Sequence, residues 1–156
     1  MNGPFDIAAI RRRESAVSAV INAVLSFGFF ALVFGLSGRM LTMAAPDRFA
    51  IDFLPQGFAV SFMASLVPTL VIRGKLRKLG LASADVKLAR IMATGLALGL
   101  ASAVLLLALA IAGPVDAVPL RPALVFKIVY GALLGFACTR IAISSLFAQT
   151  TKERPA

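Results

Sequence analysis

The sequence predicts an all-α, polytopic membrane protein: a bundle of four transmembrane helices that forms a single integral membrane domain over residues 1–156. Three observations support this prediction. Hydrophobic residues make up 60% of the chain and the mean hydropathy is +0.93, whereas about half of a typical soluble domain is apolar. Long apolar runs recur, each near the ~20 residues that a bilayer core requires. Basic residues gather at the ends of these runs.

Three uncharged runs, over residues 16–36, 53–72 and 91–112, predict the first three spans. The first run is longer than the apolar region of a secretory signal, which has about 7 to 15 residues, so we expect an uncleaved helix. Within the second run, Pro68 lacks an amide hydrogen and clashes with the carbonyl of Ala64, which predicts a bend or hinge there. Ahead of the third run, Ser83 is the expected N-cap of a helix that begins near residue 84.

The fourth predicted span, residues 123–147, is interrupted by Lys127 and Arg140. Their spacing of 13 residues corresponds to roughly 20 Å of helix. When the helix is centred, each cation lies about 5 Å inside a membrane boundary, and we expect both to snorkel toward the headgroups. Arg140 lies about 180° from the small residues of its helix, so it faces lipid or another chain.

The distribution of basic residues predicts the orientation. With the N-terminus in the cytoplasm, that side holds twelve basic residues and the other side holds four: Arg39, Arg48, Arg121 and Lys127. The positive-inside rule therefore places both termini in the cytoplasm. The cytoplasmic set consists of membrane anchors that favour anionic headgroups, namely Arg11, Arg12, Arg13, Arg73, Lys75, Arg77, Lys78 and Arg140, together with Lys87, Arg90, Lys152 and Arg154. These residues flank spans instead of forming a separate basic domain, which disfavours nucleic-acid binding.

Each span has one face of small or hydroxyl-bearing residues at helical spacing. Membrane helices associate through close backbone approach and interhelical hydrogen bonds, and such residues supply both. We predict that these faces pack the helices together, and the packing residues are Asn22, Ser26, Gly57, Ser61, Ser65, Gly95, Gly99, Gly131 and Gly135. Alternatively, Asn22, Ser61 and Ser65 form a polar site near the middle of the membrane.

Missing residue types narrow the possible functions. No Asp or Glu lies inside a predicted span, which disfavours a proton-coupled antiporter of the small multidrug type. The chain has no histidine, so imidazole haem ligation and histidine acid–base catalysis are excluded. The single cysteine, Cys138, permits no intrachain disulfide, and packing is its expected role. We find no catalytic, metal or cofactor site and expect no enzyme activity.

Residues 15–80 combine a first span with Asn22, a short external link, and a second span with a late proline, Pro68, followed by basic residues. In these features they resemble a family of small bacterial two-helix membrane proteins of unknown function. The fourth span has no such proline and departs from the pattern. This resemblance implies a bacterial inner-membrane location and no particular reaction.

The sequence therefore favours an accessory or interaction protein of the bacterial inner membrane, assembled with other membrane subunits or as a homo-oligomer. The alternative is a small oligomeric transporter or channel. In that reading, polar residues would line a path around the Pro68 bend: Asn22, Gln56, Ser61 and Ser65.

Overall fold

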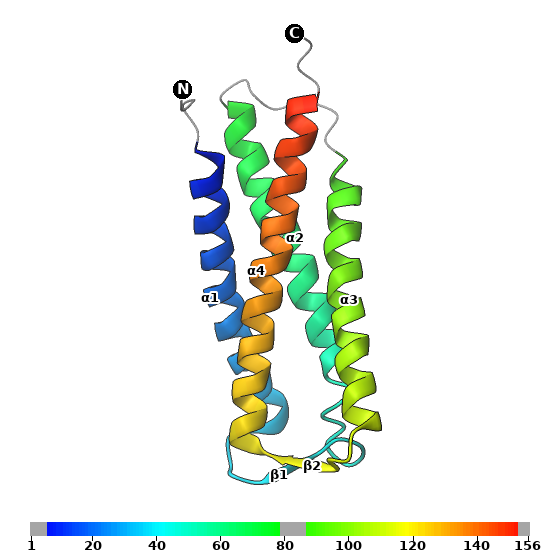
Figure 1. Cartoon of the computed structure of the whole chain (residues 1–156). Helices are drawn as coiled ribbons and strands as arrows, with labels where there is room; N and C mark the ends of the chain where they lie inside the picture. The colour runs from blue at the N-terminus through cyan, green and yellow to red at the C-terminus, as the bar shows by residue number, and fades with distance from the viewer. Residues whose placement is uncertain (1–5, 79–86, 153–156) are drawn as a thin grey trace.

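Four long helices form a single bundle in the computed structural model, which describes residues 6–78 and 87–152 (Figure 1). Helix α1 spans Ile7–Phe34, α2 spans Phe53–Lys78, α3 spans Leu88–Ala112 and α4 spans Leu120–Lys152. By length and composition, each is able to cross a membrane. The predicted helical architecture with four candidate spans is confirmed.

Helix α4 occupies the middle of the bundle and contacts the other three helices. Helix α1 packs mainly on α4, and α3 packs mainly on α2, so α1 and α3 lie on opposite sides (Figure 1). Helices α1 and α3 begin at the same end of the bundle at which α2 and α4 finish. We call this the basic end, because Arg11–Arg13, Arg73 and Lys75 lie there, and we call the opposite one the ribbon end.

Local sequence explains where the helices begin and end. Helix α1 starts before the predicted span because the Asp6 side chain accepts a hydrogen bond from the Ala9 amide at 3.0 Å, which caps the helix. It finishes at Gly35, whose φ of 74° lies in the left-handed region that favours glycine. Pro122 is tolerated in α4 because it lies in the first turn. Lys87 occupies the N-cap position of α3, and the predicted cap Ser83 lies outside the described residues.

A short two-stranded antiparallel ladder closes the ribbon end. Strand β1 (Met40–Thr42) pairs with β2 (Ala117–Pro119), with Leu41 opposite Val118. This ladder was not predicted from the sequence, because three residues are too few to show the alternation of a strand. Leu41 is fully buried and packs on a cluster of phenylalanines: Phe30, Phe34, Phe49 and Phe53. The link between α1 and α2 and the link between α3 and α4 therefore form a packed cap.

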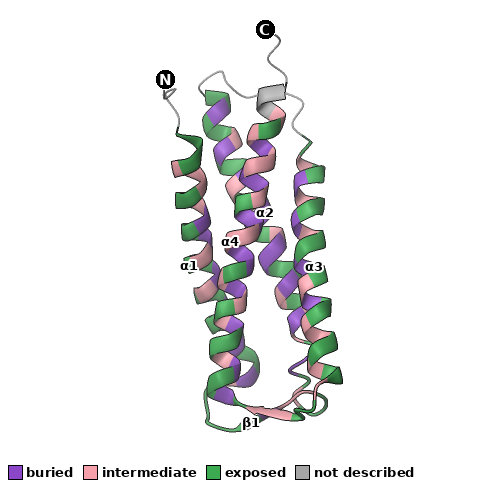
Figure 2. Ribbon diagram, viewed as in Figure 1, coloured by how far each residue is buried: buried purple, intermediate pink, exposed green. Residues whose placement is uncertain are grey.

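Buried positions line the inner faces of all four helices, and exposed positions cover the outside (Figure 2). Many buried residues are polar, including Ser61 and Thr69 at 0% exposure. The exposed surface carries large apolar side chains, such as Leu32 at 81% and Ile111 at 68%. An exposed surface with so many large apolar side chains is the opposite of the one expected for a helical bundle in water.

Candidate functional site

Helices α2 and α3 approach each other so closely that their backbones touch. A Cβ atom added to Gly99 would overlap the side chain of Ser61 and lie 2.6 Å from the carbonyl oxygen of Gly57. A Cβ added to Gly95 would lie 2.9 Å from the Cβ of Ser65. Since real Cβ atoms do not approach other atoms to within 3.0 Å, this interface requires glycine at both positions of α3.

Most hydroxyl groups on these faces are hydrogen-bonded within their own helices. Ser61 Oγ donates to the carbonyl of Phe58 at 3.1 Å, and Thr69 Oγ1 donates to the carbonyl of Ser65 at 2.7 Å. These hydroxyls are buried and satisfied, and they keep the side chains compact at the contact. Ser65 Oγ is different, because it is buried and has no hydrogen-bond partner among the described residues.

Helices α1 and α4 meet at a polar contact built from Ser18, Asn22 and Gly135. Ser18 Oγ donates to the carbonyl oxygen of Gly135 at 3.2 Å across the interface. Asn22 Nδ2 donates to the carbonyl oxygen of Ser18 at 2.8 Å and lies 3.2 Å from its Oγ. A Cβ on Gly135 would lie 2.5 Å from Asn22 Nδ2. The Asn22 amide thus occupies the space that Gly135 leaves open.

Gln56 joins three helices with one side-chain amide. Its Nε2 donates to Ser26 Oγ of α1 at 2.9 Å and to the carbonyl oxygen of Lys127 in α4 at 3.0 Å. Gly131 makes room for this junction, because a Cβ there would overlap Ser26 Oγ. The other amide atom, Gln56 Oε1, is buried and has no hydrogen-bond partner in the part of the chain that the structure describes.

Pro68 lies inside α2, which continues through it to Lys78. Because proline has no amide hydrogen, the carbonyl of Ala64 lacks its usual helical donor. Thr139 of α4 supplies a donor instead, since its Oγ1 lies 2.9 Å from the Ala64 oxygen. The predicted hinge residue therefore lies beside a hydrogen bond between α2 and α4.

Lys127 forms an ion pair inside the bundle near the ribbon end. Its Nζ lies 2.7 Å from Asp52 Oδ2, and it also lies 4.1 Å from the centre of the Phe53 ring, within the range of a cation–π interaction. The residue is only 1% exposed. The prediction that Lys127 snorkels to the headgroups is wrong, because Asp52 at the start of α2 pairs with the ammonium group inside the protein.

The predicted membrane anchors lie mostly on the surface. Arg11 is partly buried and donates from Nη1 to Ser144 Oγ of α4 at 3.2 Å, and Arg73 is partly buried as well. Arg140 is exposed, as expected for its side of α4. The remaining anchors are also exposed: Arg12, Arg13, Lys75, Arg77 and Lys78.

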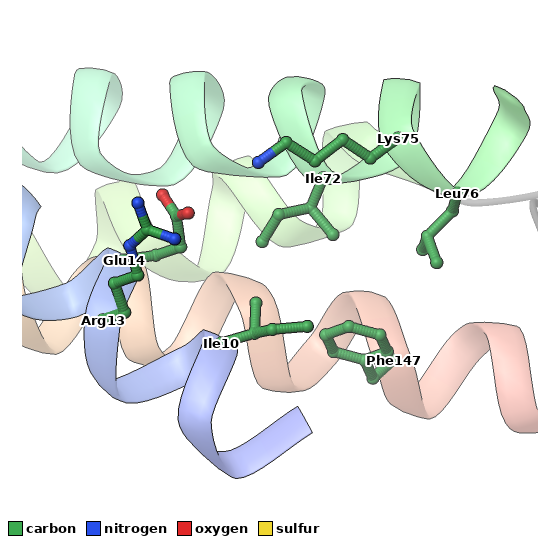
Figure 3. A pocket seen from close by; sticks show the side chains of 7 residues that line it. All are labelled: Ile10, Arg13, Glu14, Ile72, Lys75, Leu76 and Phe147. Atoms are coloured by element: carbon green, nitrogen blue, oxygen red, sulfur yellow. The ribbon is translucent and has the colours of Figure 1, made fainter. Parts of the chain in front are cut away.

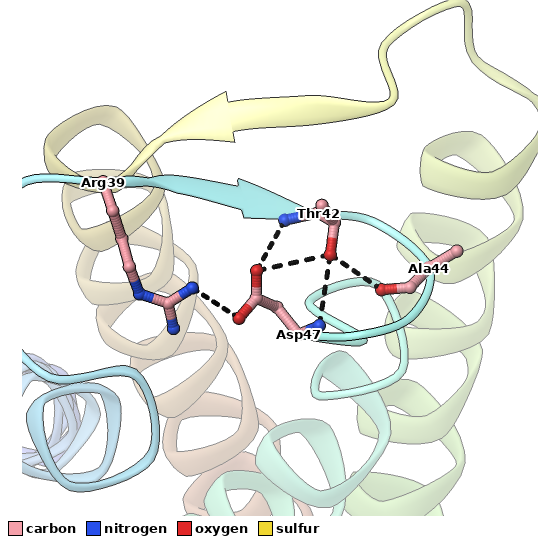
Figure 4. Close-up of polar contacts among 4 residues, drawn as sticks. All are labelled: Arg39, Thr42, Ala44 and Asp47. Carbon is pink, nitrogen blue, oxygen red and sulfur yellow. Dashed lines mark hydrogen bonds and ion pairs between the residues drawn. The ribbon is translucent and has the colours of Figure 1, made fainter.

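The cap at the ribbon end contains its own polar cluster, centred on Asp47 (Figure 4). The Asp47 carboxylate accepts a hydrogen bond from the Thr42 amide at 3.0 Å and pairs with Arg39 Nη1 at 2.6 Å. The backbone hydrogen bond and, next, the guanidinium favour the charged form, so the pKa of Asp47 lies below its ordinary value of 3.8. This cluster fixes the turn between β1 and α2.

Two pairings that organise the interior were not predicted from the sequence: Lys127 with Asp52, and Thr139 with Ala64. A sequence signal existed for the first, because an acid at the start of one span and a lysine at the same end of another lie at similar depth. For the second, the signal was Pro68, which always leaves the carbonyl four residues earlier without its helical donor.

No family model, curated protein or solved structure matches this chain. The resemblance of residues 15–80 to a two-helix membrane family therefore stays a prediction, and the geometry alone supports the functional proposals below.

Proposed function

We propose that the chain is an integral protein of the bacterial inner membrane that acts as a compact accessory or interaction subunit. The observation that supports this most directly is the distribution of side chains. Small and hydroxyl-bearing residues form many of the buried helix contacts, and large apolar residues such as Leu32 and Ile111 cover much of the outside. Contiguous apolar surface on this scale is unfavourable in water and suits a lipid environment.

The proposed orientation places the basic end in the cytoplasm. Among the described residues, the basic end carries Arg11–Arg13, Arg73, Lys75, Arg77, Lys78, Lys87 and Arg90, and the ribbon end carries Arg39, Arg48 and Arg121 as exposed cations. Lys127 adds no accessible charge to the ribbon end because it is buried against Asp52. The charge asymmetry matches the positive-inside rule and supports the proposal that both termini are cytoplasmic.

A packing role for the polar interior is supported by how its groups are bonded. Ser61 and Thr69 bond within α2, Asn22 bonds within α1, and Ser18 bonds across to α4. The glycine contacts between α2 and α3 leave no room between the two backbones. We infer that Asn22, Ser61 and Ser65 hold helices together, and that the outer surface associates with other membrane subunits or with further copies of the chain.

A second candidate function is a small oligomeric transporter or channel. It is favoured by two buried polar atoms without partners, Gln56 Oε1 and Ser65 Oγ, which lie on the same helix as Pro68. In that case, hydration of these atoms would mark a path through the bundle. An Asn22→Ala or Pro68→Ala substitution would then abolish a flux measured in vesicles, whereas the accessory proposal expects no such flux.

Cysteine labelling in intact cells tests the membrane proposal. In a Cys138→Ala background, D116C near β2 should react with a membrane-impermeant maleimide, and K87C at the start of α3 should react only after permeabilisation. The opposite pattern would overturn the orientation. Recovery of the chain in the soluble fraction after cell lysis would overturn membrane insertion itself.

Purification from native membranes in mild detergent separates the two functions. An accessory subunit should co-purify with other membrane proteins in fixed stoichiometry, or form a homo-oligomer without transport activity. A homo-oligomer that conducts solute in reconstituted vesicles would favour the second candidate.

A further inference from the structure

A cavity of about 100 Å³ opens between α1, α2 and α4 at the basic end (Figure 3). It exists because α1 packs mainly on α4 and contacts α2 only slightly. Its apolar lining consists of Ile10, Ile72, Leu76 and Phe147, which belong to a cluster of side chains from all four helices at this end. The apolar lining of this cavity is suited to contact with a hydrocarbon chain.

Three charged side chains, Arg13, Glu14 and Lys75, complete the lining of this cavity. The two cations come from different helices, and Figure 3 shows the ammonium of Lys75 and the guanidinium of Arg13 on the side of the cavity where Glu14 lies. The ion pairs among the described residues join Arg39 to Asp47 and Lys127 to Asp52, so neither cavity cation is paired with a carboxylate. Both cations are exposed and accessible to an external anion.

We propose that this cavity binds the headgroup and upper acyl chain of one anionic phospholipid of the phosphatidylglycerol type. Arg13 and Lys75 hold the phosphate between α1 and α2, and Glu14 accepts a hydrogen bond from a headgroup hydroxyl. The first carbons of one acyl chain cover Ile10 and Phe147, which are partly exposed beside the buried Ile72 and Leu76. A free phosphate ion would leave Ile10 and Phe147 uncovered, which is why the lipid is the assigned ligand.

This inference rests on the proposed membrane insertion, which puts the basic end at the level of the headgroups. It goes further, because general attraction of basic residues to an anionic surface requires no particular residue. A specific site requires Arg13 and Lys75 and tolerates the loss of other cations at the same end. The distinction can be measured with matched variants.

The test is native mass spectrometry of the full chain in detergent, titrated with phosphatidylglycerol, phosphatidylcholine or phosphatidylethanolamine bearing identical acyl chains. The native protein should retain one phosphatidylglycerol in preference to the other two lipids. Arg13→Gln combined with Lys75→Gln should weaken that binding roughly 30-fold, because each cation near a lipid surface contributes about fivefold. The matched control combines Arg12→Gln with Lys78→Gln, two exposed cations on the same helices that do not line the cavity.

Several outcomes would overturn the site. Equal loss of phosphatidylglycerol binding in the control and the cavity variants would show that the lipid is held by general attraction to the basic surface. Preferential retention of phosphatidylethanolamine would show that the site does not select an anionic headgroup and that Glu14 binds the ammonium group of this lipid instead. Displacement of the bound lipid by water-soluble glycerol 3-phosphate would show a phosphate site that needs no acyl chain. None of these results affects the cysteine-labelling test, so failure of the lipid site is distinguishable from failure of the membrane proposal.

Discussion

The hydroxyl of Thr139 donates a hydrogen bond to the carbonyl oxygen of Ala64 across the interface between α4 and α2, with an Oγ1–O distance of 2.9 Å. Both residues are buried, with exposures of 0% and 2%. Ala64 needs this donor because Pro68, four residues later, has no amide hydrogen to offer. A gap in the backbone hydrogen bonding of one helix is thus closed by the side chain of another.

Replacement of Thr139 with valine should destabilise the bundle. Valine keeps the shape of threonine but removes the donor, so the Ala64 carbonyl becomes unpaired in the interface. Hydrogen bonds between membrane helices contribute about 0.6 kcal/mol on average and up to ~1.7 kcal/mol. We expect Thr139→Val to lower the free energy of unfolding by about 1 kcal/mol, measured by circular dichroism during titration of the detergent-solubilised protein with SDS.

Two further variants show whether Pro68 is the reason that the bundle needs the Thr139 hydroxyl. Thr94→Val is the matched control, because the Thr94 hydroxyl bonds to Arg90 within its own helix and is exposed, and it should change stability little. Pro68→Ala restores the amide donor to Ala64, so Thr139→Val should cost less in that background. An equal cost with proline and with alanine at residue 68 would contradict this explanation.

Gly135 should not tolerate a side chain. Its added Cβ would lie 2.5 Å from Nδ2 and 2.9 Å from Cγ of Asn22, so α1 and α4 would have to move apart. Overpacking of this kind typically costs about 1 to 3 kcal/mol. We therefore expect Gly135→Ala to lower the SDS concentration at which the bundle unfolds, and Asn22→Ala in the same chain to recover part of the loss.

Gly28 provides the control for this substitution. It also lies in a helix, but a Cβ added there would meet nothing within 4 Å. Gly28→Ala should be neutral or stabilise the protein by up to ~1 kcal/mol, because alanine has the higher helix propensity. Equal stability of the Gly135→Ala and native proteins would show that the close contact between α1 and α4 is not required.

The helix count and the inner faces were predictable because both depend on local sequence patterns. Span length follows from apolar runs, and small residues three or four positions apart share one side of a helix. All nine residues predicted to pack the helices are buried in the structure. The sequence pattern did not indicate which helix faces meet, because the pairing of Gly135 with Asn22 and of Gly99 with Ser61 depends on the tertiary arrangement of the helices.

The polar partners were harder to predict because they are far apart in the chain. Lys127 and Asp52 are separated by 75 residues, and snorkelling was an equally reasonable fate for a lysine near a helix end. The structure decides between the two because Phe49 and Phe53 enclose the ammonium group beside Asp52. The β ladder was missed for a related reason: each strand is stabilised by the other and by the cap, not by its own sequence.

The Lys127–Asp52 pair should respond asymmetrically to loss of either charge. Asp52→Asn leaves an ammonium whose side chain is only 2% exposed without a counter-charge, whereas Lys127→Met leaves a carboxylate that is 29% exposed and still hydrated. Breaking a buried pair costs about 3 to 5 kcal/mol when the remaining charge is desolvated. We expect Asp52→Asn to lower the free energy of unfolding in SDS by an amount that approaches this range. Lys127→Met should lower it clearly less.

The double variant completes this comparison. Asp52→Asn combined with Lys127→Met removes both charges, so it should be more stable than Asp52→Asn alone. Additive losses in the double variant would indicate that the two side chains do not interact. A greater loss from Lys127→Met than from Asp52→Asn would show that the ammonium group is hydrated in the native protein.

The cap at the ribbon end should weaken in acid through Asp47. The Thr42 amide and, next, the Arg39 guanidinium stabilise the carboxylate, so the pKa of Asp47 in the folded protein lies below the ordinary 3.8. The stabilisation is therefore present above about pH 4 and is lost as the pH falls through the folded pKa. A titration of the Asp47 side-chain carboxyl carbon by NMR should give a midpoint below 3.8. Arg39→Gln should raise that midpoint, whereas Arg48→Gln should not, and a native midpoint at or above 3.8 would show that the cluster does not hold the turn.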